Sequence, residues 1–423
     1  MHDGMVDFKA ETRAQIMGLP IAEVDPAQPR LFAADAFWPI FERLRAEDPV
    51  HFTDSATYGP FWSIALWDDI MAVDSNHQVF SSADGIALST LEAKAENEKR
   101  GTRPSFISMD PPRHDEQRKT VSPVVAPSNL QVMGPLIRER AGKILDSLPI
   151  GVEFDWVEHV SKDLTAMTLA TLFDFPQEDR GLLPYWSDVM TNSPGHGPVE
   201  SWEQKREVLD QMVGRFVGLW NERVNAPPGG DLISMLAHGQ STRNMERAEY
   251  AGNLGLLIIG GNDTTRNTIS GSVYALNKHP GEYAKLKADP SLIPSMVSET
   301  IRWQTPLTHM MRTATQDFEL RGKTIRKGDR VVMWYVSGNR DASAVHDPET
   351  YCIDRERPRH HMSFGFGIHR CVGNRLAELQ LTIIWEEIMK RFPTIELAGE
   401  PTRTHSIFIK GYETLPVVIP TRT

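Results

Sequence analysis

One of the chain's two cysteines stands in a glycine-rich segment, FGFGIHRCVG, at positions 364–373. Cys371 directly precedes a run with helical periodicity, and the amides and dipole at a helix N-terminus favour a thiolate over a thiol. A thiolate is the form in which cysteine binds a metal ion. Gly365 and Gly367 permit a tight turn and let the backbone lie flat against a planar ligand. The alternative is a buried structural cysteine, the more common fate of an isolated one.

A second candidate is the run GGNDTT at 260–265, inside a helical pattern that extends from Asn244 to about Asn277. Two adjacent glycines cost a helix about 2 kcal/mol relative to alanine. The sequence therefore weakens its own helix at the centre, where functional distortions tend to occur. Asp263 and Thr264 place a carboxyl group beside a hydroxyl, and such a pair can relay protons. The alternative is a polar kink without chemistry.

Two further pairs combine charged or titratable side chains one helical turn apart. Glu299 and Arg302 are spaced so that their side chains meet on a helix. His114 and Arg118 also lie one turn apart. Pairs of this kind are common on solvated helix faces, so neither pair is decisive alone.

The elements that must position these residues are mostly helices. The pattern contains no alternation of strands and helices typical of a parallel sheet, so the fold class is mainly α with a small β region. We find no repeat or linker and expect a single domain over residues 1–423, with a polar, proline-punctuated segment at 1–30 on its surface. The predicted elements are helices at 35–48, 244–277 and 372–391 within a largely helical stretch from 113 to 300, strands at 50–53 and 59–66, short β runs within 305–336, and an irregular meander at 337–363.

Composition excludes several classes of protein. A formal net charge of −11 over 423 residues argues against a protein that holds nucleic acid. Cys352 and Cys371 are too few for a disulfide framework, which favours a reducing cytoplasm. No signal-peptide layout opens the chain, and no apolar run approaches the roughly 18 residues needed to span a membrane.

Taken together, the motifs F-G-x-G-x-H-x-C-x-G, G-G-x-D-T and E-x-x-R resemble those of the cytochrome P450 family. The resemblance implies the P450 fold, with haem b (iron protoporphyrin IX) held between the long central helix and the cysteine loop. Dioxygen would be the co-substrate. Glu299 and Arg302 would have a structural role, locking the meander under the cysteine loop.

The resemblance also assigns residues to the cofactor and to the reaction. Cys371 would ligate the iron, Thr264 would donate a hydrogen bond to dioxygen, and Asp263 would relay protons from solvent. Cys352 has no such setting and is expected to be structural. The residues expected to contact haem besides Cys371 are His114, Arg118, Arg312 and His369 at the propionates, and Phe364, Gly365 and Gly260 against the ring.

The strings at 108–127, 260–271 and 308–317 look like the soluble bacterial subfamily that hydroxylates medium-chain alkanes and fatty acids at the terminal carbon. Because an alkyl chain offers no polar handle, a narrow channel that presents only its methyl end would have to set the position of attack. We expect an almost wholly apolar substrate pocket lined by Ile86, Leu88, Leu256, Ile259, Leu307, Thr308 and Phe408. The segment 188–200 is a candidate mobile lid.

No flavin or iron–sulfur motif is present, so the two electrons would come from a ferredoxin served by a ferredoxin reductase. Cations expected around the cysteine face, where an acidic ferredoxin would dock, are Lys119, Arg359, Arg370 and Arg375. Another hydrophobic substrate (a terpene, steroid or branched lipid) remains open. So does a non-catalytic haem-thiolate sensor, which would not need Asp263 and Thr264. Peroxide-driven members of the family carry an Arg–Pro arrangement instead of this pair.

Overall fold

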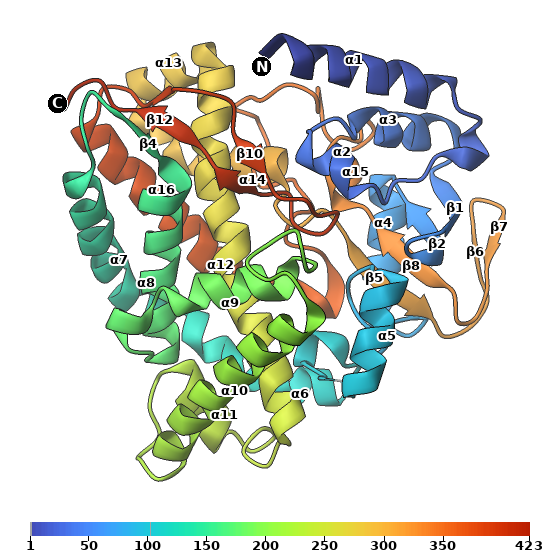
Figure 1. Cartoon of the computed structure of the whole chain (residues 1–423), viewed down its shortest axis with the longest axis horizontal. Coiled ribbons are helices and arrows are strands. Elements are labelled where there is room, and N and C mark those ends of the chain that lie inside the picture. The colour runs from blue at the N-terminus through green and yellow to red at the C-terminus, as the bar shows by residue number, and fades with distance from the viewer. Residues whose placement is uncertain (1, 102) are drawn as a thin grey trace.

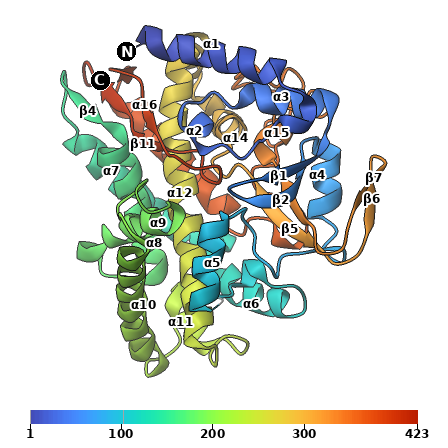
Figure 2. The ribbon, with the colours of Figure 1, turned by 45° about the vertical axis from the view of Figure 1, so that its right-hand side comes forward.

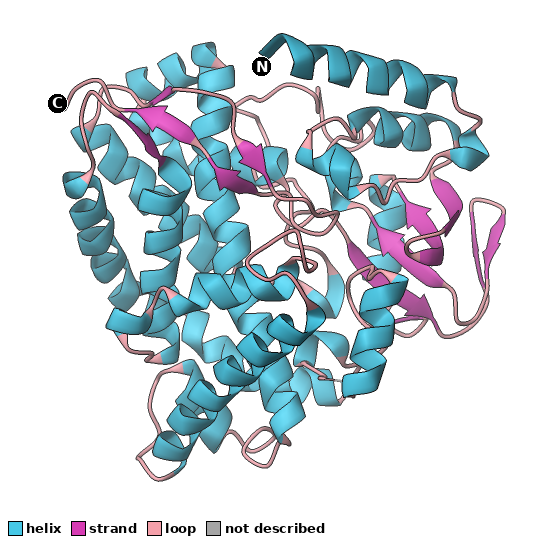
Figure 3. Cartoon of the chain, in the orientation of Figure 1, coloured by secondary structure: helices cyan, strands magenta, loops and turns pink. Residues whose placement is uncertain are grey.

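The computed structural model of the protein describes residues 2–101 and 103–423. Its long helix α12 (Arg247–Lys278) runs through the centre of the molecule (Figure 1). Helices gather on one side of α12, while the largest sheet lies on the other side (Figures 1 and 3). The mainly α fold with a small β region is thereby confirmed. Among the described residues, no helix combines the length and the apolar character needed to cross a membrane.

The elements follow one another with few long connections except between α15 and α16. The other α-helices are α1 (His2–Gly18), α2 (Pro29–Ala33), α3 (Trp38–Glu47), α4 (Trp67–Asp74), α5 (Leu91–Arg100), α6 (Arg113–Val121), α7 (Pro127–Ser147), α8 (Asp163–Phe173), α9 (Leu182–Thr191), α10 (Trp202–Val224), α11 (Leu232–His238), α13 (Pro280–Ala288), α14 (Ile293–Gln304), α15 (Tyr335–Gly338) and α16 (Asn374–Arg391). The strands are β1 (Val50–Ser55), β2 (Gly59–Ile64), β3 (Phe80–Ser81), β4 (Glu153–Asp155), β5 (Met310–Ala314), β6 (Phe318–Leu320), β7 (Lys323–Ile325), β8 (Arg330–Met333), β9 (Glu396–Leu397), β10 (Thr402–Arg403), β11 (Tyr412–Thr414) and β12 (Pro416–Val418).

The largest sheet has the strand order β1-β2-β8-β5-β3. β2 and β8 are parallel, whereas the other neighbours are antiparallel. This order brings segments near residues 60, 80, 310 and 330 together, so the sheet places side chains from distant parts of the chain at one wall of the site described below. β12 pairs with both β4 and β9 near the C-terminus.

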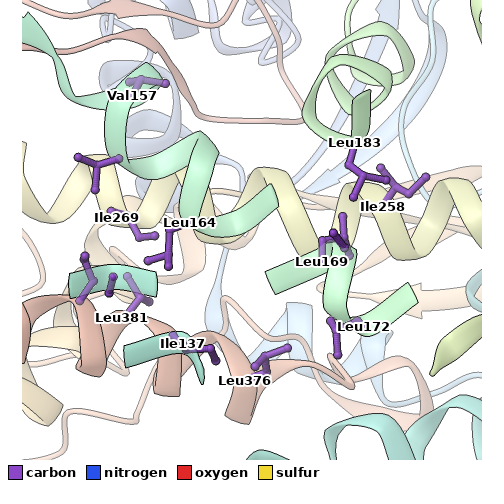
Figure 4. Packing of buried hydrophobic residues seen from close by; sticks show 14 of the residues in the cluster. Ile137, Val157, Leu164, Leu169, Leu172, Leu183, Ile258, Ile269, Leu376 and Leu381 are labelled. Carbon is purple, nitrogen blue, oxygen red and sulfur yellow. The ribbon is translucent and has the colours of Figure 1, made fainter. Parts of the chain in front are cut away.

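The main hydrophobic core lies between α12 and the helices beside it. Figure 4 shows Leu169 of α8 and Leu183 of α9 close to Ile258 of α12, with Leu376 of α16 on the opposite side of α8. These side chains are buried. Because α12 packs along much of its length, it is held rigidly between the two halves of the site.

The polar N-terminal segment departs from expectation because much of it is helical. Helix α1 packs on α3: Ile16 is buried, and Arg13 forms an ion pair with Glu42 at 2.8 Å. One row of contacts therefore suffices to order a helix whose composition is largely polar. The predicted helix at 35–48 is confirmed as α3, and the predicted final helix as α16.

Helix α12 is continuous, and the expected loosening near Gly260 is not seen as a break. Neighbouring side chains support this weak sequence. A Cβ atom on Gly261 would lie 2.8 Å from Leu169 Cδ1, so the glycine allows α8 to pack closely. The Asn262 side chain accepts a hydrogen bond from the Thr165 hydroxyl at 3.0 Å. Tertiary contacts thus outweigh the low helix propensity.

Candidate active site

The cysteine loop packs against the end of α4. Gly365 and Gly367 have φ values of +66° and +64°, in the left-handed region that favours glycine. A Cβ atom on Gly367 would lie 2.6 Å from the carbonyl oxygen of Asp74, so a larger residue has no room. The backbone N–H of Cys371 donates to the Phe364 carbonyl oxygen at 2.8 Å and closes the loop. The glycines therefore serve both the turn and its close approach to α4.

Cys371 is exposed toward an internal cavity that it lines, although protein surrounds it on the other sides. This burial raises the pKa of the Cys371 thiol, because a thiolate loses hydration there. The amides of Gly373 and Asn374, at the start of α16, act in the opposite direction, as do the guanidinium groups of Arg118 and Arg370. The sulfur is thus surrounded by groups that stabilise a thiolate once a positive partner is present.

The cavity has a volume of about 1820 Å³ and extends from the cysteine loop to α12 and beyond. It exceeds the roughly 300–1,000 Å³ of ordinary ligand pockets, so it can hold a large cofactor together with a substrate. The expected apolar residues that line it are Ile86, Leu88, Leu256, Ile259, Leu307 and Phe408. The expectation for Thr308 is wrong: its side chain is fully buried and its hydroxyl donates to the Ile407 carbonyl oxygen instead.

The two members of the acid–alcohol pair occupy different surroundings. Thr264 lines the cavity on the wall formed by α12, and its hydroxyl donates to the Gly260 carbonyl oxygen at 3.0 Å. Asp263 is fully buried behind that wall and does not line the cavity. Successive side chains on a helix point in different directions, so the alcohol faces the reaction space while the acid faces the protein interior.

Asp263 belongs to a buried charged network that joins α12 to α9. Its Oδ1 atom lies 2.9 Å from Arg266 Nη2 and accepts a hydrogen bond from Asn262 Nδ2 at 3.1 Å. Arg266 also bonds to Asp188 Oδ1 at 2.8 Å. Within the described part of the chain, Asp263 Oδ2 has no hydrogen-bond partner. Burial raises the pKa of Asp263 to about 6; Arg266 opposes this rise and the like charge of Asp188 adds to it.

Cationic and imidazole groups gather at the cysteine edge of the cavity. Arg118, Arg312 and His369 line the cavity, and the His114 ring packs edge-on against the His369 ring at 4.4 Å. His114 Nε2 and both ring nitrogens of His369 are buried without hydrogen-bond partners among the described residues. Burial, reinforced by neighbouring cations, lowers the pKa of His369 to about 2, so its ring is neutral. Buried polar atoms without partners in a folded protein indicate a ligand or water at that place.

Glu299 and Arg302 form a fully buried pair on α14. Two guanidinium nitrogens of Arg302 donate to the two Glu299 carboxylate oxygens, at 2.8 and 2.7 Å. A third nitrogen donates to the carbonyl oxygens of Asn339 and Pro348, both at 2.9 Å. The pair therefore ties α14 to the irregular chain that precedes the cysteine loop.

Comparisons with known proteins identify the fold. A family model described as cytochrome P450 matches residues 199–410. Linalool 8-monooxygenase of Pseudomonas putida is 34% identical over 403 residues, covering 93% of this chain and 98% of its own. The methyl-branched lipid omega-hydroxylase of Mycobacterium tuberculosis is 29% identical over 423 residues, covering 95% and 97%. The solved structure of CYP153D17 from Sphingomonas sp. PAMC 26605 is 44% identical, with a TM-score of 0.88, and covers 95% of this chain and 100% of its own.

The chain belongs to the cytochrome P450 family. It is an oxidoreductase of the monooxygenase class that acts on hydrophobic substrates and receives electrons from redox partners. Its cofactor is haem b and its co-substrate is dioxygen.

The residues around the cavity of this cytochrome P450 fit a haem. Cys371 points its sulfur into the cavity, as a thiolate ligand to iron must. The unpartnered nitrogens of His114 and His369 lie at the edge where Arg118 and Arg312 could meet two carboxylates. Phe364, Gly365 and Gly260 also line the cavity, as the sequence predicts.

Some residues of the site could not be found from the motifs. Arg266 stands three positions after Asp263 on one helix, and this spacing would have suggested a contact. Asp188 and Asp74 reach the site only through tertiary structure. Tyr335, whose hydroxyl donates to Asp74 Oδ2 at 2.7 Å, is likewise brought in from the segment after β8.

Proposed function

We propose that Cys371 holds haem iron and that the protein hydroxylates the terminal carbon of medium-chain alkanes or fatty acids. The observation that carries the proposal is that Cys371 and Thr264 line one cavity from different elements, the cysteine loop and α12. Bound haem supplies the activation of dioxygen for insertion into a C–H bond. The protein must position the substrate, provide protons and exclude water.

The protein's own groups divide these tasks. The Thr264 hydroxyl, free to turn from the Gly260 carbonyl, donates a hydrogen bond into the cavity where dioxygen enters. Asp263 replaces the proton from behind, since a carboxyl group with a pKa of about 6 exchanges protons readily near neutral pH. His114, Arg118, Arg312 and His369 hold the two haem carboxylates.

Terminal attack rests on the shape and apolarity of the cavity and on similar proteins. Apolar side chains from four separate segments, represented by Ile86, Leu256, Leu307 and Phe408, leave an alkyl chain without polar anchors. One relative is named an omega-hydroxylase, which denotes terminal attack in that protein. A second candidate is hydroxylation of an acyclic terpene alcohol, which the 34% identity to a linalool 8-monooxygenase favours.

Electrons are proposed to come from a ferredoxin that docks on the cysteine side. Lys119, Arg370 and Arg375 are exposed there, and Arg118 donates to the Arg370 carbonyl oxygen, which joins α6 to the loop. Arg359 is also exposed and pairs with a neighbouring glutamate at 3.2 Å. Attraction between exposed cations and an acidic partner is screened by salt. The electron-transfer rate should fall steeply between 50 and about 300 mM salt.

Two substitutions at the chain's two cysteines test the ligand. Cys371→Ala should abolish the thiolate-specific Soret band of the reduced carbon monoxide complex. Cys352→Ala is the matched control and should retain the band, because Cys352 lies in the meander with its sulfur on Asp354. A full band in the Cys371 variant would overturn the ligand assignment.

Substrate class is tested by titrating alkanes, fatty acids and linalool of graded length while following the Soret shift, with the products identified by mass spectrometry. We expect the tightest binding for medium-length chains and oxidation at the terminal carbon. Tighter binding of linalool would favour the second candidate. Products oxidised mainly at mid-chain carbons would contradict a channel that admits only the methyl end.

The proton relay is tested with Thr264→Ala, which should divert electrons from product to hydrogen peroxide. Thr265→Ala is the neighbouring control, since Thr265 also lines the cavity. Product and peroxide are measured per electron consumed. A fully coupled Thr264 variant would refute the relay.

A further inference from the structure

Asp74, the last residue of α4, lies at the junction between the cysteine loop and the cationic edge of the cavity. Its side chain is 1% exposed. Oδ1 accepts a hydrogen bond from Arg312 Nη2 at 2.8 Å. Oδ2 accepts two, from the Tyr335 hydroxyl at 2.7 Å and from the Phe366 backbone N–H at 2.8 Å. One carboxylate thus joins three segments that are more than two hundred residues away from it in the sequence.

These contacts constrain the cysteine loop more tightly than its own hydrogen bonds do. The Phe366 amide is held by Asp74 Oδ2, while Gly365 and Gly367 on either side press against the same helix end. Cβ atoms built on them would lie 3.2 Å from Asp74 Oδ2 and 2.6 Å from its carbonyl oxygen, respectively. The loop is therefore seated on Asp74 a few residues before the sulfur of Cys371.

The same carboxylate fixes the direction of Arg312. Of the five N–H groups of that guanidinium, one is given to Asp74 and one to the Met311 carbonyl oxygen at 2.8 Å. The side chain is buried yet lines the cavity. A buried arginine whose orientation is set on one side presents its remaining donors in a fixed direction on the other.

We propose that Asp74 is a positioning residue that couples the cysteine loop to Arg312 and so sets the placement of haem between them. The proposal rests on the haem site proposed above. Because Asp74 acts through Phe366 and Arg312, removing its charge should loosen haem and disturb the thiolate bond without removing any residue that touches the cofactor. Loss of a negative charge near the site should also shift the reduction potential to more positive values, since the reduced haem carries the more negative charge.

The test compares Asp74→Asn with Asp69→Asn, a change of the same type on the same helix. Asp69 is also buried, but its carboxylate pairs with Arg321 on the outer side, away from the loop. Measurements on purified holoprotein are the rate of haem transfer to apomyoglobin, the reduction potential, and the fraction of the carbon monoxide complex that keeps the thiolate Soret position. Thermal unfolding is recorded for both variants.

For Asp74→Asn we expect haem transfer to be about 10- to 100-fold faster, the factor expected for loss of one hydrogen bond to a charged group. We also expect a partial loss of the thiolate band and a positive shift of the potential, with none of these in Asp69→Asn. Equal haem transfer rates and potentials in the wild type and Asp74→Asn would overturn the proposal. So would equal haem loss in the two variants at equal unfolding temperatures.

A second route remains if Asp74→Asn does not fold. Tyr335→Phe removes one donor to Asp74 with little change in volume, and should speed haem transfer by a smaller factor than Asp74→Asn. In combination with Arg312→Met, the effects should be less than additive, because both changes act on one contact. Fully additive effects would refute the coupling. Failure of the haem site itself would show separately, as a missing thiolate band in the wild-type protein.

Discussion

The buried acid on α12 should reduce the stability of the folded protein as pH rises toward neutrality. The folded-state pKa of Asp263 is about 6, against 3.8 for an ordinary aspartate. A carboxyl group whose pKa is raised on folding holds its proton more tightly in the folded state, so the fold loses stability once pH exceeds the unfolded pKa. At about 1.4 kcal/mol per pH unit, the cost reaches about 3 kcal/mol above pH 6.

The substitution Asp263→Asn isolates this cost because an amide keeps the shape of the side chain and cannot ionise. The assay is urea unfolding of the holoprotein of the wild type and the variant at several values between pH 5 and pH 7.5. About half of the cost is already present at pH 5, so the variant should gain about 1 kcal/mol relative to the wild type between pH 5 and pH 7. Taking the difference removes the titration of all other groups.

Thr264→Ala is the matched control, since its difference from the wild type should not depend on pH. A flat difference for Asp263→Asn would mean that Asp263 titrates alike in the folded and unfolded protein, and a difference of opposite sign would mean that Arg266 dominates the balance. Either result would refute the assignment of a poised acid. The stabilised variant should also lose coupling of electrons to product, because a group that costs stability is retained for its function.

Other substitutions test the packing around the site. Glu299→Gln leaves a buried arginine without its charged partner and should lower the free energy of unfolding by about 3–5 kcal/mol in urea. Gly367→Ala should prevent normal haem incorporation, measured from the ratio of Soret to protein absorbance; Gly322→Ala, at a similar left-handed φ but in open space, should not. Gly252→Ala drives a Cβ into a backbone carbonyl and should lower the unfolding temperature by several degrees, whereas Gly281→Ala, which meets nothing within 4 Å, should leave it unchanged.

Elements with strong local patterns could be predicted from the sequence. The long helix from Arg247 to Lys278 ends where His279 and Pro280 stop it, as expected, and the final helix begins at Asn374. Helix α1 could not be predicted, because its polar sequence is ordered by contacts with α3 that no local pattern reveals. The continuity of α12 through its glycines has the same origin, since packing against α8 decides it.

The motifs predicted the residues that face the cavity better than those that support them. Cys371 and Thr264 both line it, as expected. Thr308 was expected there because of its position, but its neighbours offer carbonyl oxygens and turn the hydroxyl away. Asp74 reaches Phe366 across 292 positions of the chain, and no spacing rule connects residues so far apart.

The comparison of Asp74 with Asp263 shows how one residue type serves two tasks. Both carboxylates are buried and both face an arginine. Asp74 accepts hydrogen bonds on each oxygen, so adding a proton would break contacts that hold the loop. Asp263 has Arg266 on one oxygen and no hydrogen-bond partner for the other among the described residues, so a proton can be taken up there without breaking a bond. The number of donors that face each carboxylate therefore separates the positioning role from the proton-carrying role, and it predicts that Asn should replace Asp263 with gain of stability but Asp74 only with loss.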